Sequence, residues 1–238
     1  MSMNRASARD YGFQVELSYP PLPPVLSERD WHQFAHALSE RGLEYSRLST
    51  ERGALEIVRT FSESRESTVY TFTRERLRVR HDFVGELGFQ PFCENVLLVV
   101  TAAFEALHVP VMLDQRTTVR KLVSMSGRGD ARRFLMERVS KIGSEALGPF
   151  GRPMHTVGLR YFFPMVEDKP FEFDVRIESL MEDPHTLYFQ NRGKFVVPPV
   201  EAAGADEVVR RLGLTREFIE GEVFAFLDQF REPPGDEA

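Results

Sequence analysis

Arginine and acidic residues alternate with apolar residues in several short segments of the chain. Residues 76–83 read Arg-Leu-Arg-Val-Arg-His-Asp-Phe, and residues 171–178 read Phe-Glu-Phe-Asp-Val-Arg-Ile-Glu. Guanidinium groups that share one face of a sheet could hold an anionic or phosphorylated ligand, or the carboxylates of a partner protein. A ladder of cross-strand ion pairs on a solvated face is the simpler interpretation of the same pattern. The charged residues predicted to form this ligand or partner face are Arg78, Arg80, Arg120, Arg160, Asp174, Arg176 and Glu178.

Alternatively, the chain is an enzyme that acts on an anionic or phosphorylated substrate, with Glu178 or His81 as its acid or base. Its anion clamp would consist of Arg78, Arg80, Arg160 and Arg176. His81 shares the apolar face of its segment with Leu77, Val79 and Phe83, which favours a structural histidine. These interpretations differ in geometry. Convergence of the charged groups in one pocket would favour an enzyme, and a spread of complementary pairs across the sheet would argue against it.

A second group of cations lies in a predicted basic helix over residues 130–146 and in the turn before it. Asp130 is its expected N-cap, and a phosphate or nucleic acid could dock at the helix N-terminus. A solvated helix face explains the same residues. The formal net charge of -6 disfavours nucleic acid, because phosphate neutralisation supplies most of that affinity. The residues of this candidate site are Arg128, Arg132, Arg133, Arg138 and Lys141.

Two histidines and the lone cysteine could also do chemistry. His32 and His36 are four residues apart, in a row with Glu28 and Glu40, so one helix face could present metal ligands. That row flanks the apolar stripe and is expected to face solvent, so no cofactor is predicted. Cys93 falls in the first turn of an apolar helix, where the dipole could lower its thiol pKa, whereas its apolar neighbours favour burial.

The elements that position these residues follow from hydrophobic periodicity. Runs of consecutive strands between single helices are typical of α+β proteins rather than of βαβ repeats. The sequence therefore predicts one or two antiparallel sheets built from two meanders, packed against amphipathic and apolar helices. The expected strands are residues 12–19, 44–49, 54–61, 67–73, 76–83, 111–125, 155–163, 171–181 and 185–196. The expected helices are a first helix capped by Ser27 and stopped by Gly42, and residues 90–107, 130–146, 206–212 and 215–230.

Composition bounds the domain organisation and the location. The 238 residues, 42% of them apolar, suit a soluble protein with an N-terminal half (1–147) and a C-terminal half (148–238) that share one core. A single cysteine, no secretory signal and no apolar stretch long enough to span a bilayer indicate a cytoplasmic, bacterial-type protein.

Three segments carry a resemblance to a known family. Residues 71–77 (Thr-Phe-Thr-Arg-Glu-Arg-Leu) lead into the apolar helix, residues 157–161 read Val-Gly-Leu-Arg-Tyr, and residues 218–220 begin a closing helix. Over residues 67–230 this order resembles a sporadically distributed family of uncharacterised bacterial proteins with a Gly-Leu-Arg-Tyr strand after a central apolar helix. The asparagine that follows the tyrosine in the family is Phe162 here. The resemblance implies an α+β fold and a binding role, and it assigns no catalytic residues.

These observations favour a non-enzymatic protein-interaction module or an accessory subunit of a bacterial assembly, with a protein partner or a second copy of the chain. The last predicted helix is apolar on most sides, so it must be buried in the fold or against another subunit. The alternative is an enzyme or binder of an anionic or phosphorylated ligand on the arginine-lined face. A third possibility is nucleic-acid binding through the basic helix. No membrane partner is expected.

Overall fold

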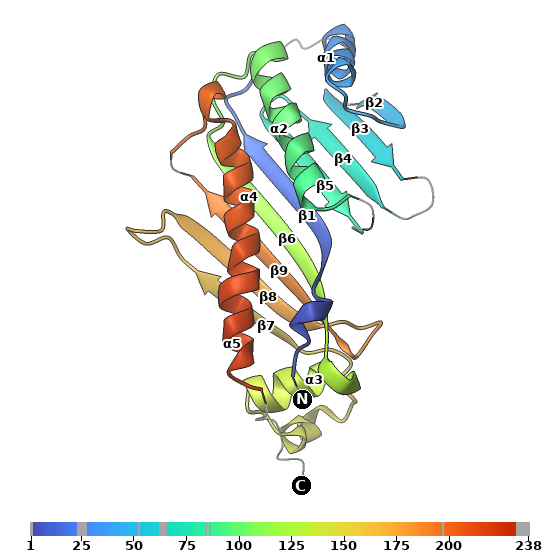
Figure 1. The fold of residues 1–238 in the computed structure, drawn as a ribbon, viewed down its shortest axis with the longest axis vertical. Helices are drawn as coiled ribbons and strands as arrows, with labels where there is room; N and C mark the ends of the chain where they lie inside the picture. Colours follow the sequence, from blue (N-terminus) through green and yellow to red (C-terminus); the bar gives the residue numbers. More distant parts are fainter. Residues whose placement is uncertain are drawn as a thin grey trace.

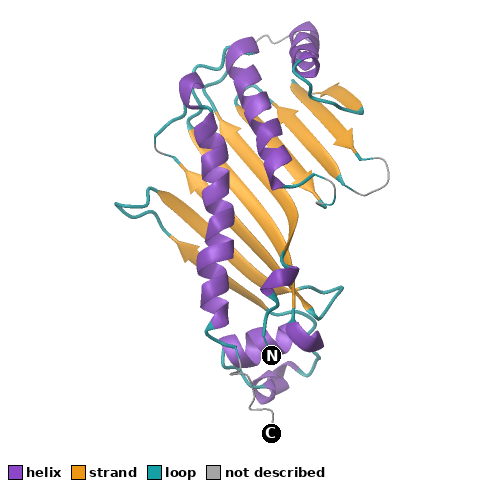
Figure 2. Cartoon of the chain, in the orientation of Figure 1, coloured by secondary structure: helices purple, strands orange, loops and turns teal. Residues whose placement is uncertain are grey.

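The chain forms one antiparallel sheet with helices on one of its faces (Figure 1; Figure 2). This architecture comes from a computed structural model that describes residues 2–22, 28–51, 53–61, 66–83, 85, 87–196 and 198–231. Within these residues the sheet has nine strands, in the order β2-β3-β4-β5-β1-β6-β9-β8-β7. The strands are β1 (Arg9–Ser18), β2 (Arg47–Glu51), β3 (Ala54–Thr60), β4 (Ser67–Phe72), β5 (Arg76–Asp82), β6 (Asp114–Ser124), β7 (Gly158–Phe163), β8 (Phe171–Ser179) and β9 (Thr186–Phe195).

The described α-helices pack against the sheet. They are α1 (Glu28–Glu40), α2 (Phe89–Ala106), α3 (Ala131–Arg133), α4 (Asp206–Phe218) and α5 (Phe224–Asp228). In Figure 1, α2 lies across β5 and β1, and the long C-terminal rod that contains α4 and α5 lies across β6, β9 and β8. No helix of the described residues is long and apolar enough to cross a membrane.

The predicted α+β class and the two meanders are confirmed. One meander is β2–β5 and the other is β7–β9, and β1 and β6 pair with each other between them. β6 also pairs with β9, so strands from both halves of the chain build a single sheet. Short hairpins make each meander, whereas the centre depends on pairing between distant segments.

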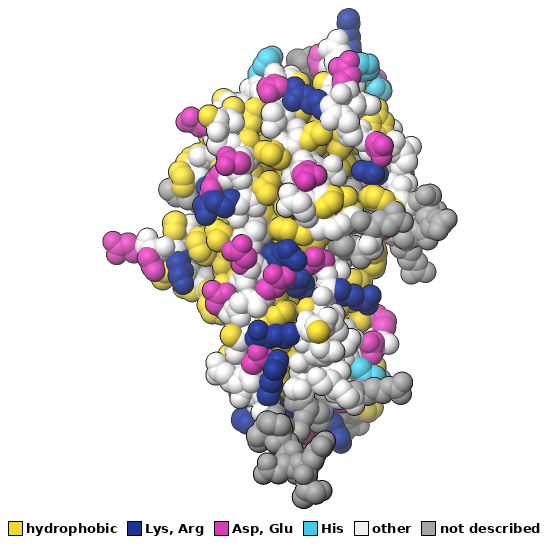
Figure 3. Space-filling view, viewed as in Figure 1, with side chains coloured by type: hydrophobic (Ala, Val, Ile, Leu, Met, Phe, Trp, Pro, Cys, Tyr) yellow, Lys and Arg dark blue, Asp and Glu magenta, His cyan; other side chains and the backbone are white. Residues whose placement is uncertain are grey.

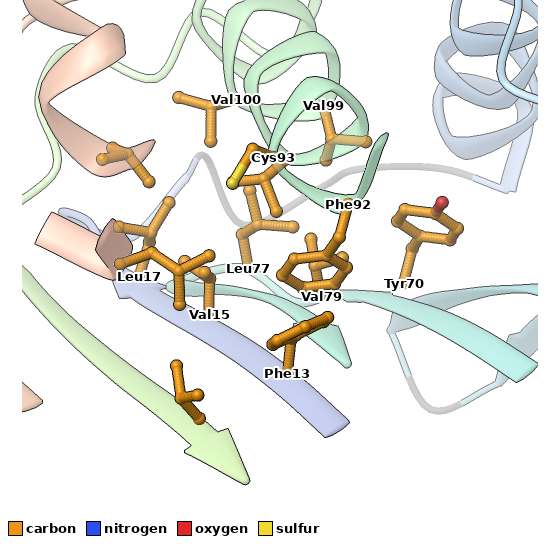
Figure 4. Packing of buried hydrophobic residues seen from close by; sticks show 14 of the residues in the cluster. Phe13, Val15, Leu17, Tyr70, Leu77, Val79, Phe92, Cys93, Val99 and Val100 are labelled. Carbon is orange, nitrogen blue, oxygen red and sulfur yellow. The ribbon is translucent and has the colours of Figure 1, made fainter. Parts of the chain in front are cut away.

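The buried face of each strand follows the period-two pattern. Phe13, Val15 and Leu17 of β1 point toward α2, beside Leu77 and Val79 of β5 (Figure 4). These side chains and the inward face of α2 are almost fully buried. A fully buried side chain of this size contributes about 1.5–3 kcal/mol, so the α2–sheet contact stabilises the fold strongly.

The sequence predicted Phe83 on the buried face of its strand, and the structure shows that this prediction is wrong. β5 ends at Asp82, and Phe83 has a positive φ of 59° that turns its side chain out of the strand's alternation. Its ring is 49% exposed and packs edge-on against Tyr11, with the ring centroids 5.5 Å apart. The alternation therefore stops one residue earlier than expected.

The two predicted C-terminal helices are one continuous rod. α4 runs into a π-helical turn, Ile219–Val223, and then into α5. Thr215, the first residue of the second predicted helix, is instead buried in mid-helix, and its hydroxyl donates to the carbonyl of Arg211 at 3.0 Å. Packing against the sheet overrides the local helix-breaking tendency of Gly213.

The predicted basic helix 130–146 is shorter than expected. Asp130 caps it as predicted, because its Oδ1 accepts from the backbone N–H groups of Arg132 and Arg133. α3 then continues as a π-helix, Phe134–Val139, and the chain leaves the helix at Lys141, whose φ is 57°. Ser27, the predicted cap of the first helix, lies outside the described residues.

Candidate functional site

The face of the sheet opposite the helices, which we call the open face, carries most of the charged residues singled out in the sequence. Strand register arranges them in rows that run across the sheet. The first row is Asp82, Gly12, Arg120, Gln190, Arg176 and Arg160. The second row is Arg80, Gln14, Thr118, Arg192, Asp174 and Phe162. The third row is Arg78, Glu16, Arg116, Lys194 and Glu172.

Asp82 links β5 to β6 across β1 on the open face. Its carboxylate accepts from Arg80 Nε at 2.5 Å and from Arg120 Nη1 at 3.1 Å. To reach Asp82, the Arg120 side chain crosses β1 above Gly12, where an added Cβ would lie 3.1 Å from Arg120 Nη1. Gly12 therefore leaves the space for this ion pair.

The other carboxylates of the open face are also paired. Glu16 accepts from Arg78 Nε at 2.8 Å and lies 3.3 Å from Arg76 Nη1. Asp174 accepts two hydrogen bonds from Arg160, at 2.8 and 2.9 Å, and these bonds hold the pKa of Asp174 below its usual value. The pattern is the predicted ladder of cross-strand pairs.

The residues proposed as an anion clamp do not converge. Arg78 and Arg80 lie on β5, whereas Arg160 lies on β7 at the far edge of the sheet. Arg176 faces Arg160 in the β7–β8 register, and its Nε has no hydrogen-bond partner among the described residues. Glu178 lies one row further along β8, opposite Gly158 and Tyr188. This spread argues against an active site built from these groups.

The open face contains a depression of about 430 Å³ over β1, β6, β9 and β8. Arg116 and Arg192 line it, and neither forms an ion pair or hydrogen bond with any residue that the structure describes. Phe162 forms one wall, with 59% of its surface exposed. Sequence reasoning noted neither Arg192 nor Phe162 as site residues, because only the strand register brings them together.

His81 lies on the opposite, helix-covered face and cannot act with the arginines of the open face. Its side chain is buried, with Nδ1 2.8 Å from Thr68 Oγ1 and Nε2 3.0 Å from Glu66 Oε1. Glu66 also accepts from the backbone N–H of Leu87 at 2.7 Å. The group ties β4, β5 and the start of α2 together, which is the structural role that the sequence favoured.

We expect His81 to make the protein less stable in mild acid. Burial lowers the pKa of His81 from its ordinary 6.5, and the nearby Glu66 carboxylate only partly opposes this. The unfolded chain therefore binds a proton near pH 6.5 that the folded chain does not, so the free energy of unfolding falls as pH drops below 6.5. Each unit of pKa depression corresponds to about 1.4 kcal/mol.

Urea unfolding at about pH 7.5 and about pH 5.5 measures this effect. His81→Gln should flatten the pH dependence, whereas His36→Gln, at an exposed position, should leave it as in the wild type. Equal pH dependence in the His81→Gln variant and the wild type would show that another group is responsible.

Two arginines of the basic segment form ion pairs with carboxylates of the same segment. Arg132 Nη2 lies 2.7 Å from Asp130 Oδ2, and Arg133 Nε lies 3.9 Å from Glu137 Oε1. Lys141 Nζ lies 5.9 Å from the centre of the Phe230 ring, and Arg138 also has an interaction partner. The Arg128 side chain lies outside the described residues. Intrahelical pairs of this kind favour a structural role over a phosphate site.

The candidate metal ligands His32 and His36 lie apart from the cysteine, on α1. His32 lies 3.8 Å from Glu28 and His36 lies 3.5 Å from Glu40, so each histidine has its own carboxylate on the exposed face of α1. The described residues contain no group of three or more side chains that could hold a metal ion. Cys93 lies on the buried face of α2, and burial raises its thiol pKa to about 11.

A second surface was not anticipated from the sequence. Between edge strand β7, β8 and the C-terminal rod lies an apolar groove of about 440 Å³, and an adjoining part of about 460 Å³ extends along the hairpin after β7. Phe163 and Phe218 line both parts. We call this the β7 groove. Its sequence signal is the aromatic run at the end of the Gly-Leu-Arg-Tyr segment, which breaks the polar–apolar alternation.

Compared with known proteins, the chain matches no model of a protein family and no curated protein sequence. The resemblance to the sporadically distributed bacterial family stays a prediction.

Proposed function

We propose that the protein is a non-enzymatic protein-interaction module that binds a carboxylate-bearing segment of a partner protein in the depression of the open face. The observation that supports this most strongly is the pair of exposed arginines, Arg116 and Arg192, which form no close ion pair or hydrogen bond with the described residues and lie beside the exposed ring of Phe162. Arginine and aromatic side chains are the residues most often responsible for affinity at protein interfaces.

The charge balance inside the depression favours an anionic occupant. Two of its carboxylates form ion pairs with arginines outside it, Glu16 with Arg78 and Asp174 with Arg160. The third, Glu172, lies 3.5 Å from Lys194 within the depression. The Arg120 cation is committed to Asp82. Arg192 acts on Asp174 only through its charge and Arg116 has no close ion pair among the described residues, so both guanidinium groups can donate hydrogen bonds to an incoming carboxylate.

Phe162 adds an apolar contact to this site. A segment with acidic side chains alone would leave the Phe162 ring in water, whereas a segment that also carries Phe or Leu would cover it. We therefore expect the bound segment to alternate acidic and apolar residues. The same proposal makes this chain an accessory subunit of a cytoplasmic bacterial assembly, in which another subunit carries the acidic–apolar segment.

A second candidate is a small anionic ligand in the same depression. Its volume of about 430 Å³ falls in the range of about 300–1,000 Å³ that is typical of small-molecule sites. The same two arginines would then bind phosphate or carboxylate groups of a metabolite. The proposed experiment separates the two candidates.

Fluorescence anisotropy with a labelled peptide that alternates Glu with Phe or Leu tests the main proposal. Wild-type protein should bind it, and Arg116→Glu or Arg192→Glu should weaken binding about tenfold or more, since a charge-assisted hydrogen bond is worth about 1.5–3 kcal/mol. Arg29→Glu, on the exposed surface of α1, makes the same charge change away from the site and should bind as wild type.

The competing outcomes are defined by the probes. No binding of the acidic–apolar peptide, or binding that both depression variants leave unchanged, would contradict the proposal. Binding of pyrophosphate but not of the peptide, lost in both variants, would favour the small ligand. Binding of single-stranded DNA that is insensitive to these variants would indicate the basic segment instead.

A further inference from the structure

The two edges of the sheet differ in chemistry. β2, at one edge, reads Arg-Leu-Ser-Thr-Glu, which is the short, charged type of edge that resists pairing with other chains. β7, at the other edge, reads Gly-Leu-Arg-Tyr-Phe-Phe. No described residue outside β8 forms a backbone hydrogen bond with β7, so its outer edge offers free N–H and C=O groups.

β7 exposes aromatic side chains on both faces of the sheet. Phe162 lies on the open face, and Phe163, 43% exposed, lies on the face with the helices. The hairpin that follows adds the exposed Met165 and Val166. An exposed apolar edge strand is unfavourable in water and promotes association.

The β7 groove continues this apolar surface beneath the C-terminal rod. Tyr161 packs against Phe226 with their ring centroids 5.5 Å apart, and Phe163 packs against Phe218 at 5.1 Å. In Figure 3, apolar side chains show between this rod and the hairpin that projects at the left. Tyr161 and Phe163 of the edge strand line the groove, so it lies next to the free edge.

We propose that β7 pairs antiparallel with β7 of a second copy of this chain, about a two-fold axis at Tyr161 and perpendicular to the sheet. In this register Arg160 lies opposite Phe162 of the partner subunit, and Leu159 lies opposite Phe163 of the partner subunit. Aromatic–aliphatic and cation–aromatic cross-strand pairs both stabilise sheets. The strand is thus complementary to itself along its length.

Other registers and partners fit β7 less well. A register centred on Arg160 would place two guanidinium groups opposite each other, which is destabilising. Pairing of β7 with β2 of another copy would place aromatic rings against Arg47 and Glu51, and such head-to-tail contacts grow into open chains. Pairing of β7 with a charged strand of another protein would add little binding energy, because the charge of Arg160 is already neutralised by Asp174.

The symmetry also closes the β7 groove. A two-fold axis perpendicular to the sheet keeps the helices of both copies on the same side. The two grooves then meet above the new β7–β7 seam, and Phe163 and Phe226 of both copies can share one apolar layer. Cross-strand neighbours lie side by side, so Phe162 still faces the depression of the open face.

Sedimentation of the full chain across a concentration series tests the dimer. We expect a mass of twice 27.4 kDa that dissociates on dilution. Tyr161→Lys places two like charges across the axis and should raise the dimer Kd by roughly tenfold or more. Thr50→Lys, on the opposite edge strand, should leave the Kd unchanged. A monomer at all concentrations, or a dimer indifferent to Tyr161→Lys, would overturn the proposal.

Disulfide trapping tests the register independently. Tyr161→Cys should cross-link with itself under mild oxidation, because directly opposed residues have Cα atoms about 4.5–5.5 Å apart. Leu159→Cys and Phe163→Cys should cross-link when mixed and not alone, and the buried Cys93 does not compete. A different pattern would overturn this register. Arg116→Glu protein should still dimerise, so failure of the proposed function and failure of the dimer are distinguishable.

Discussion

Gly193→Ala should destabilise the protein by about 3 kcal/mol or more. A Cβ at Gly193 in β9 would lie 2.6 Å from Thr117 Oγ1 and 2.7 Å from both Thr215 Oγ1 and Phe195 Cε2. Thr117 and Thr215 form a buried hydrogen bond of 2.6 Å that joins β6 to α4 across this gap. The added methyl group would have to push the rod away from the sheet and break that bond. The midpoint of urea unfolding measures the loss.

Gly213→Ala is the matched control for this prediction. Gly213 lies inside α4, and the nearest atom to an added Cβ is Glu217 Oε1 at 3.9 Å. Because alanine stabilises a helix interior relative to glycine, the free energy of unfolding of this variant should be about 0.5–1 kcal/mol higher than that of the wild type. The same substitution is thus expected to lower the free energy of unfolding at position 193 and to raise it at position 213. Similar midpoints for both variants would show that the β9–α4 contact is not close packed.

Lys121→Met should lower the free energy of unfolding by about 2 kcal/mol. Lys121 is 3% exposed, and its Nζ lies 2.5 Å from Asp10 Oδ1 and 2.8 Å from Glu220 Oε1. Removal of the ammonium leaves these two carboxylates with Arg216 as their remaining described cation. Breaking a fully buried pair costs about 3–5 kcal/mol, and the loss is smaller here because Glu220 reaches solvent.

Lys194→Met is the surface counterpart of this substitution. Lys194 is partly exposed on the open face and lies 3.5 Å from Glu172 Oε2. Exposed pairs of this kind contribute less than about 1 kcal/mol, so thermal unfolding of this variant should stay close to the wild type. An equal loss of stability in both variants would contradict the buried role of Lys121.

The sequence predicted the strands well where their side chains alternate. Leu77, Val79, Phe173 and Val175 are buried, as their period-two spacing requires. The meanders were predictable because short turns connect neighbouring strands. The sequence did not decide whether the Cys93 thiol is activated by the helix dipole or buried, since a single segment does not reveal what packs against it.

The order of the strands could not be read from local patterns. β1 pairs with β5 and β6, and the register of these distant segments decides which charges meet, such as Arg120 with Asp82. For the same reason the depression went unseen, because Arg116, Arg192 and Phe162 come from three separate strands. The break expected near Thr215 was wrong because contact with Thr117 stabilises a continuous helix there.

The strand order also governs how the chain can fold as it is synthesised. β6 occupies the middle of the sheet, yet the neighbour on its second edge, β9, follows only at residues 186–195. A nascent chain therefore carries a half-finished sheet with a bare interior edge until most of the polypeptide has left the ribosome. Such late, long-range closure slows folding and exposes the chain to wrong pairing, so ribosomal stalling before β9 would leave the first half dependent on chaperones.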